Sequence, residues 1–267
     1  MKFYLGTHRP TWLERLDIPL FVSRRVMPKW KLPRARSGWA LDSGGFTELQ
    51  KFGGWQVSPQ QYASDVRRYR DEIGHLEWAA PQDWMCEPVV INGGWAGGVY
   101  FVGTHLSVAE HQARTVENYL ILRDFAPDLP FVPVLQGWEL DDYLRHIDAY
   151  TAVGVDLTTE CTVGVGSVCR RQDTDDLADI VSRLAETGLR LHGFGVKTEG
   201  LRIARDYLTS ADSLAWSKDG RHTPTYCGGT SHKSEANCMV HALRWRTAVL
   251  AAADGPQRSW QPRLEWA

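Results

Sequence analysis

The feature that most constrains the fold is a regular alternation of short apolar runs and longer segments with helical periodicity. Eight short runs predict strands, at residues 2–7, 20–23, 39–42, 76–80, 131–135, 155–158, 189–195 and 210–216. Helical patterns lie between or after them, at residues 47–52, 58–73, 107–123, 140–152, 174–186, 199–207 and 235–253. This alternation is typical of a parallel α/β fold, and the count of eight predicts a closed (β/α)8 TIM-like barrel. An open doubly wound sheet is the alternative, but no Gly-x-Gly-x-x-Gly pattern follows the first strand.

Polar residues and glycines follow the predicted strands. They are His8, Arg24, Asp42, Asp83, Gln136, Gly164 to Ser167, His192 and Asp212. Because active sites of such barrels lie at the carboxyl ends of the strands, we expect these residues to face one cavity. Asp83 can accept hydrogen bonds from ring N–H and amino groups, and Gln136 can both donate and accept. Each residue alone is more often structural, but together they suit a small, flat, polar heterocycle.

The stretch from Asp42 to Phe46 combines a carboxylate, two glycines and an aromatic side chain. Its two glycines let a ligand approach the backbone closely, and Phe46 can cover a flat ring. The simpler interpretation is that Asp42 caps the helix that follows. Asp42 and Asp212 are the two carboxylates available for catalysis. One can attack an anomeric carbon while the other moves protons, as in enzymes that cleave glycosidic bonds.

A basic loop follows the second predicted strand. Its cations, with Trp30 and Pro33 between them, are Arg24, Arg25, Lys29, Lys31, Arg34 and Arg36. Basic residues interleaved with an aromatic can grip a phosphate backbone, and a solvated loop is the alternative. The formal net charge of −2 does not by itself indicate nucleic-acid binding.

The chain shows neither a signal peptide nor a run of about 18 apolar residues that could span a bilayer, so no membrane partner is expected. Its five cysteines form no regular framework, which fits a reducing cytosol, and we expect a cytoplasmic location.

Four metal-binding side chains lie close together near the end of the chain, in the pattern Cys227-x4-His232-x5-Cys238-x2-His241. Zinc in structural sites takes four such groups in a tetrahedron, so we expect a structural zinc ion that pins the last helix to the barrel. The alternative is a glycine-rich loop with incidental histidines. The corresponding domain division is a barrel over residues 1–220, followed by a zinc-binding loop and C-terminal helix over residues 221–267.

Several motifs resemble the tRNA-guanine transglycosylase superfamily. They are Asp42-Ser43-Gly44-Gly45-Phe46, Gln136-Gly137 and His192-Gly193-Phe194-Gly195-Val196. Three further stretches resemble its short DNA-modifying branch of phages and some bacteria: Gly166 to Arg171, Ala211 to Ser217 and Ala242 to Arg246. That branch exchanges guanine in DNA for a 7-deazaguanine base. The resemblance covers roughly residues 2–216.

The resemblance implies a role for each matching residue. Asp42 corresponds to the proton-transfer acid, Phe46 to the aromatic that stacks on the base, and His192 to the residue on the other face of the ring. The implied base pocket comprises Ser43, Gly44, Gly45, Phe46, Asp83, Gln136, Gly137, Gly166, Ser167, His192 and Gly193. The nucleophilic aspartate of the family follows the last strand, where Asp212 is the nearest acid and Ala215 is an alternative aligned position.

Three functions remain open at this stage. The first is DNA base exchange, in which a flipped guanosine is replaced by a free 7-deazaguanine, such as 7-cyano-7-deazaguanine, through a covalent Asp–deoxyribose intermediate. The second is the same chemistry on tRNA, because phosphate contacts do not distinguish the two polymers. The third is a non-catalytic nucleic-acid or nucleobase binder. The short chain and the absence of the usual tRNA-enzyme zinc spacing favour DNA, with a host-cytoplasm location if the protein is phage-encoded.

Overall fold

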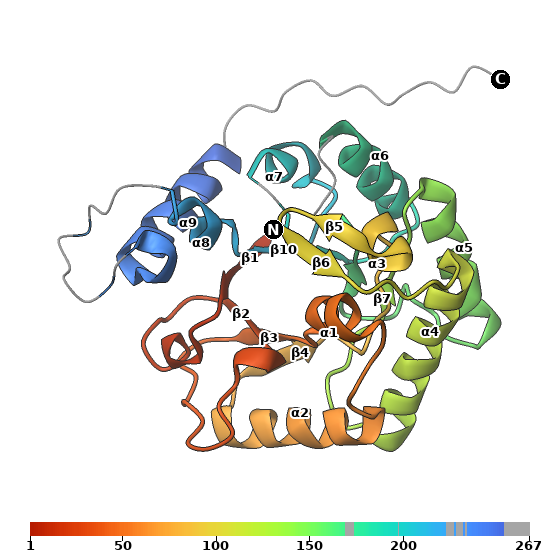
Figure 1. Ribbon diagram of the computed structural model, residues 1–267, viewed down its shortest axis with the longest axis horizontal. Coiled ribbons are helices and arrows are strands. Elements are labelled where there is room, and N and C mark those ends of the chain that lie inside the picture. Colours follow the sequence, from red (N-terminus) through yellow and green to blue (C-terminus); the bar gives the residue numbers. More distant parts are fainter. Residues whose placement is uncertain (169–173, 197, 223–226, 228–231, 233, 254–267) are drawn as a thin grey trace.

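Eight parallel strands form one curled sheet in the computed structural model, which describes residues 1–168, 174–196, 198–222, 227, 232 and 234–253 (Figure 1). The strand order is β4-β3-β2-β1-β10-β9-β8-β7. Their bounds are β1 Lys2–Thr7, β2 Leu20–Ser23, β3 Trp39–Asp42, β4 Leu76–Ala79, β7 Val134–Leu135, β8 Val163–Val165, β9 Leu191–Gly193 and β10 Ser210–Ser213. The predicted α/β class with eight parallel strands is therefore confirmed.

The two edges of this sheet meet at a single point. Ala79 of β4 and Phe131 form an isolated parallel bridge. The Ala79 N–H donates to the Pro130 carbonyl at 2.9 Å, and the Val132 N–H donates to the Ala79 carbonyl at 3.2 Å. Among the described residues no longer ladder joins β4 to β7, so the predicted closed barrel is shown only as a strongly curled sheet.

Most of the helices cover the outside of the curled sheet (Figure 1). Their bounds are α1 Gly45–Phe52, α2 Pro59–Ile73, α3 Pro88–Asn92, α4 Val108–Phe125, α5 Leu140–Ala152, α6 Thr174–Ala185, α7 Thr198–Ala204, α8 Ala215–Asp219 and α9 Met239–Ala253. Short 3-10 turns occupy η1 Pro10–Trp12, η2 Arg24–Val26 and η3 Glu235–Asn237. Capping residues explain where two of the helices begin. Ser58 caps α2 ahead of Pro59, and Ser107 forms a capping box with Glu110 at the start of α4.

The sixth strand lies later than the sequence predicts. Residues 155–158 form no strand, since a turn occupies residues 157–159, and Val163–Val165 forms the strand instead. The Asp156 carboxylate accepts hydrogen bonds from the Thr158 N–H at 2.9 Å and the Thr158 hydroxyl at 2.6 Å. Such local side-chain bonds compete with strand pairing. The correction places Gly166 and Ser167 directly at the carboxyl end of a strand.

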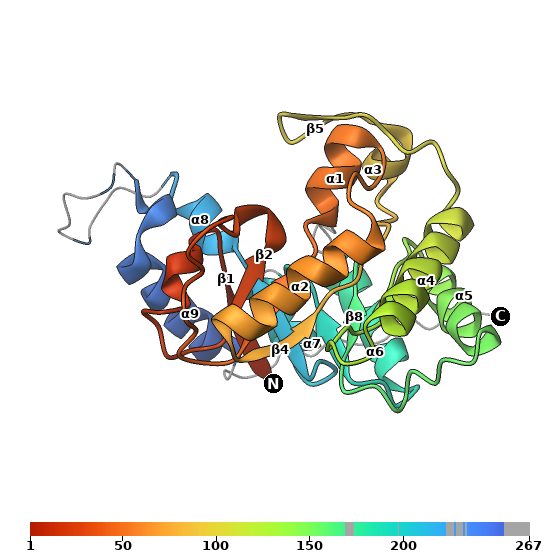
Figure 2. The ribbon, with the colours of Figure 1, turned by 90° about the horizontal axis from the view of Figure 1, so that it is seen from below.

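The predicted loop or lid at residues 92–98 is partly ordered as an antiparallel hairpin of β5 Gly94–Ala96 and β6 Val99–Phe101. It projects beyond α1, on the side of the molecule opposite the N-terminus (Figure 2). Since β1 starts at the N-terminus, this is the side on which the parallel strands end.

An aromatic cluster fills the concave interior of the sheet. Its members are Tyr4, Phe21, Ala40, Trp78, Ala80 and Val132, with Phe194 packed against them. Trp39 and Leu41 point the other way, into the layer between sheet and helices, as the two-residue period of a strand requires. The interior is therefore closed by side chains below the carboxyl ends of the strands. No helix in the described part of the chain is long and apolar enough to cross a membrane.

Candidate active site

A cavity of about 170 Å³ lies at the carboxyl ends of the strands. Predicted site residues that line it are Asp42, Gly45, Phe46, Asp83, Gln136, Gly166, Ser167 and Asp212. Sequence reasoning did not assign to the site the other lining residues, which are Phe21, Ala80, Met85, Glu87, Phe194 and Gly195. The cavity is small for a ligand pocket and suits one ring system better than a whole nucleotide.

Two carboxylates enter this cavity from opposite sides of β1 in the sheet order. Asp42 ends β3, and Asp212 belongs to β10. Burial raises the pKa of Asp42, and the negative charge of Asp212 raises it further, against hydrogen bonds from the Ser23 hydroxyl and the Gly44 N–H. Asp42 therefore holds a proton more readily than an ordinary aspartate does.

Asp212 has different surroundings. Its Oδ1 accepts a hydrogen bond from the Gly195 N–H at 2.9 Å and lies 3.4 Å from Nε2 of His192. The two aspartates therefore differ in their contacts: Asp42 accepts from the Ser23 hydroxyl and the Gly44 N–H, whereas Asp212 accepts from the Gly195 N–H and lies beside His192.

A buried hydrogen-bonded chain forms another wall. Nε2 of Gln136 donates to Oδ2 of Asp83 at 2.5 Å, and the Ser43 hydroxyl lies 3.3 Å from Oδ1 of Asp83. The Ser167 hydroxyl lies 2.7 Å from Oε1 of Gln136 and 2.9 Å from Oε2 of Glu87. Alternating donors and acceptors along one wall suit the edge of a purine-like base.

The hydrogen-bonded side chains of this wall leave room only for glycine at position 166. A Cβ at this position would lie 2.2 Å from Nε2 of Gln136, so any larger residue would displace the amide. The next residue, Ser167, adopts a left-handed φ of 57°, which is uncommon for a residue other than glycine. The turn after β8 therefore accepts some strain while it holds the Ser167 hydroxyl against Gln136.

The buried Asp83 carboxyl group makes the folded protein less stable as the pH rises toward neutral. Burial, with the nearby charge of Asp42, raises its pKa from 3.8 to about 7. The folded protein consequently binds a proton that the unfolded chain releases, and it loses stability as pH rises from about 4 to about 7. We expect Asp83→Asn to raise the midpoint of thermal unfolding by at least about 2 °C at pH 8, with a much smaller difference at pH 4.

The control is Asp148→Asn, because Asp148 lies on the exposed face of α5. Equal unfolding midpoints of Asp83→Asn and wild type at both pH values would contradict the raised pKa of Asp83.

His192 does not line the cavity, contrary to its predicted place on one face of the bound ring. Its side chain is fully buried beneath the cavity. The centroid of its ring lies 4.6 Å from that of Trp78 and 4.8 Å from that of Phe194. Phe194 lies two residues later and lines the cavity instead. His192 lies behind the cavity lining, against Phe21, Phe194 and Asp212, which all line the cavity.

Four other predicted residues support the walls without lining them. Ser43 bonds to Asp83, and Gly44 has a φ of 85° at the start of α1, a conformation that glycine adopts without strain. A Cβ on Gly137 would lie 2.7 Å from Cβ of Asp142, and one on Gly193 would lie 2.7 Å from Cγ2 of Val196. Close packing, not contact with a ligand, explains these glycines.

The basic loop divides into two parts. Arg24 lies 3.1 Å from Asp65 and 3.8 Å from Glu48, and Arg25 lies 2.6 Å from Glu48. These two arginines thus hold α1, which carries Phe46, against the end of β2. The remaining predicted phosphate-binding cations are exposed: Lys29, Lys31, Arg34 and Arg36.

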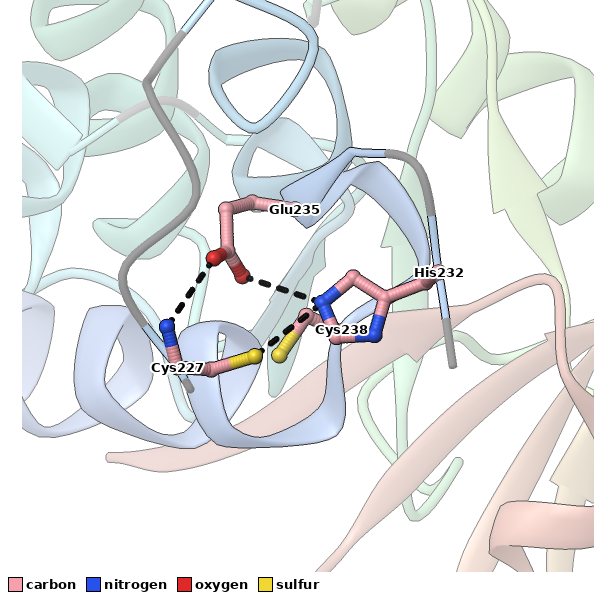
Figure 3. A group of neighbouring side chains, drawn as sticks. All are labelled: Cys227, His232, Glu235 and Cys238. Atoms are coloured by element: carbon pink, nitrogen blue, oxygen red, sulfur yellow. Dashed lines mark hydrogen bonds and ion pairs between the residues drawn. The ribbon is translucent and has the colours of Figure 1, made fainter. Parts of the chain in front are cut away.

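A second cluster near the C-terminus could hold a metal ion (Figure 3). The ligand atoms of Cys227, His232, Glu235 and Cys238 all lie within 4.8 Å of one another. Nε2 of His232 lies 3.1 Å from Sγ of Cys227 and 3.8 Å from Oε2 of Glu235. Three of these residues belong to the metal site predicted from the sequence, Glu235 was not predicted, and His241 is not among the four. The backbone N–H of His241 donates to Sγ of Cys238 at 3.4 Å.

Comparison with solved structures adds no functional argument. The chain is similar to the Amycolatopsis orientalis BexX/CysO complex, with 13% identity, a TM-score of 0.39, and coverage of 84% of this chain and 71% of that chain. It is also similar to Rhizobium etli pyruvate carboxylase T882A with acetyl coenzyme A, with 10% identity, a TM-score of 0.36, and coverage of 83% and 22% respectively. No curated protein sequence matches the chain.

A family comparison is more informative, because the matching family model extends over residues 1–267. Its description is DeoxyPurine in DNA protein A, which connects the family with deazapurine modification of DNA. The chain belongs to the DpdA family.

Proposed function

We propose that the protein is a DNA base-exchange transglycosylase that replaces guanine with a 7-deazaguanine, such as 7-cyano-7-deazaguanine. The observation that carries this proposal is the convergence of Asp42 and Asp212 on a cavity sized for one ring. Family membership supports DNA as the substrate. The target guanosine must leave the duplex stack to reach these groups.

In the proposed first step, a carboxylate oxygen of Asp212 attacks C1′ of the flipped nucleotide. The C1′–N9 bond breaks, its electron pair stays on guanine, and the Asp42 carboxyl group gives its proton to the leaving base. The raised pKa of Asp42 supports this role, because a general acid must hold its proton at working pH. The product is a covalent ester between Asp212 and deoxyribose.

In the second step, the incoming 7-deazaguanine occupies the vacated pocket. Its N9–H loses a proton to Asp42 while N9 attacks C1′, and the C1′–O ester bond breaks. Asp212 is released as a carboxylate and Asp42 is again protonated, so the cycle needs neither ATP nor a redox partner. Asp83, Gln136 and Ser167 hold the base edge, and Phe46 and Phe194 provide the aromatic walls.

The direct test is mass spectrometry of nucleosides from duplex DNA incubated with the protein and a labelled 7-deazaguanine. We expect label in DNA and equimolar release of guanine. The same experiment with tRNA tests the alternative polymer. A protein that labels neither, and forms no denaturation-resistant adduct with DNA, would be a non-catalytic binder.

We further propose that the Cys227–His232–Glu235–Cys238 cluster holds a structural zinc ion. Two thiolates, one imidazole and one carboxylate form a donor set that zinc accepts with tetrahedral geometry. The cluster connects the segment before α9 to the start of that helix, and Trp245 of α9 packs against Phe3 of β1 with ring centroids 6.2 Å apart. Metal at this position would therefore hold α9 onto the barrel.

Metal analysis tests the ligand assignment. We expect about one zinc ion per chain, and a loss of zinc affinity of about 100-fold in both Cys238→Ser and Glu235→Ala. His241→Ala is the matched control and should retain zinc and thermal stability. Zinc loss in His241→Ala together with retention in Glu235→Ala would restore the four-ligand set predicted from the sequence.

A further inference from the structure

The β5–β6 hairpin is anchored firmly at its base. Phe101 is fully buried, and its ring packs edge-to-face on Phe46, with centroids 5.5 Å apart. The Val102 N–H donates to the Gln50 carbonyl at 3.0 Å, and Nε2 of Gln50 donates to the Tyr100 carbonyl at 2.6 Å. A Cβ on Gly93 would lie 2.8 Å from the Val102 carbonyl, so the two arms approach closely at the base. The base of the hairpin is thus hydrogen-bonded to and packed against α1.

The tip is a tight two-residue turn. Gly97 and Gly98 have φ values of 58° and 76°, between the paired residues Ala96 and Val99. Two positive φ values are the signature of a type I′ turn, which follows the natural twist of a hairpin. The tip therefore has a defined shape without packing against the rest of the protein.

The outward face of the hairpin is aromatic and exposed. Trp95 and Tyr100 form a cross-strand pair, are 76% and 52% exposed, and contact each other edge-to-face at 5.6 Å. Residues 92–104 carry no charged side chain. Exposed aromatic surface is unfavourable in water, so such a face indicates a binding partner. Its lack of cations indicates contact with flat, uncharged groups instead of phosphates.

The hairpin also lies where the target strand must approach. It stands above the carboxyl ends of the strands (Figures 1 and 2), and the Phe46 that anchors it lines the base cavity. The cavity holds one ring, so a base that enters it leaves a gap in the duplex directly outside. Unstacking and unpairing cost free energy, which proteins often recover by inserting apolar side chains between base steps.

We propose that Trp95 and Tyr100 form a wedge that stacks on the bases beside the flipped guanosine and fills the gap in the duplex. This inference rests on the proposed function. It assigns DNA contact to an uncharged surface, separate from the exposed cations of the basic loop. Single-stranded DNA has no gap to fill and should gain little from the wedge.

The test compares duplex and single-stranded oligonucleotides of the same sequence. We expect the Trp95→Ala, Tyr100→Ala double variant to lose at least about tenfold in kcat/KM on the duplex and less than about twofold on the single strand. Trp95→Phe retains a ring and should keep most activity. Phe125→Ala removes a similarly exposed ring at the end of α4 and is the matched control, with no expected change on either substrate.

Equal losses on the two substrates, or no loss on the duplex, would overturn the wedge. A higher KM for the free base with unchanged use of DNA would instead identify the hairpin as a lid over the base and would also overturn it. Fluorescence of 2-aminopurine placed beside the target guanine reports unstacking without turnover. If wild type exchanges no base yet raises this fluorescence and the double variant does not, the proposed chemistry fails while the wedge stands.

Discussion

Asp212→Asn is expected to abolish base exchange, with a loss of at least about 10⁴-fold in the rate of incorporation, because it removes the proposed nucleophile. The asparagine keeps the size of the side chain and can still accept from the Gly195 N–H. The substitution should therefore leave the fold and the base pocket intact. The measurement is incorporation of labelled 7-deazaguanine into duplex DNA, together with capture of a denaturation-resistant adduct without free base.

The adduct makes the Asp212 prediction specific. Wild type should form it, Asp212→Asn should not, and Asp148→Asn should behave as wild type because Asp148 is exposed on α5. Ala215 is the other position at which a nucleophile could align, but it begins α8 and does not line the cavity. If Asp212→Asn forms the adduct normally, another residue must be the nucleophile. Asp42 is then the next carboxylate to test in the cavity.

Much of this site could be predicted because a parallel sheet brings strand ends together. Asp42, Asp83, Gln136 and Asp212 are separated widely in sequence, yet each follows or ends a strand that local patterns identify. The topology then places them around one cavity. The misplaced sixth strand did not change this assignment, because Gly166 and Ser167 follow both the predicted strand and the observed one.

The contacts that the sequence did not indicate have a common cause, because they join residues that are far apart in the chain. Nothing in the local sequence indicates that Arg25 pairs with Glu48, 23 positions away. The sequence therefore predicted Arg24 and Arg25 only as cations for phosphate binding. Phe194 and His192 are two residues apart and both pack on Trp78, and the local sequence does not indicate that Phe194 is the one that lines the cavity. Glu235 lies in the cluster that could hold a metal ion without having been predicted there, because motif reasoning favoured cysteine and histidine over carboxylate.

The same argument applies to the energy of the site. Four carboxyl groups, those of Asp42, Asp83, Glu87 and Asp212, line a small cavity, and burial together with the charge of a neighbouring aspartate raises the pKa of both Asp42 and Asp83. A fold selected only for stability would replace them with apolar side chains or amides. Their presence is better explained by chemistry that needs a proton donor, a nucleophile and a base-binding group within reach of one ring.

Asp42→Asn should slow adduct formation by about 10²- to 10⁴-fold, because asparagine cannot donate a proton to the departing guanine. The wild-type rate should fall as pH rises through the raised pKa of Asp42, whose acid form is the reactive one, and Asp42→Asn should lack that decline. DNA with 7-methylguanine at the target position provides the decisive comparison. Its base already carries a positive charge and leaves without a proton, so the deficit of Asp42→Asn should shrink on this substrate.

An equal deficit of Asp42→Asn on guanine and on 7-methylguanine would show that Asp42 positions the sugar or the base and does not transfer the proton. Loss of free-base binding in the same variant would point to a pocket defect instead. Retained binding, a smaller deficit on 7-methylguanine and a lost pH dependence would together assign the proton to Asp42, because only proton donation links all three observations.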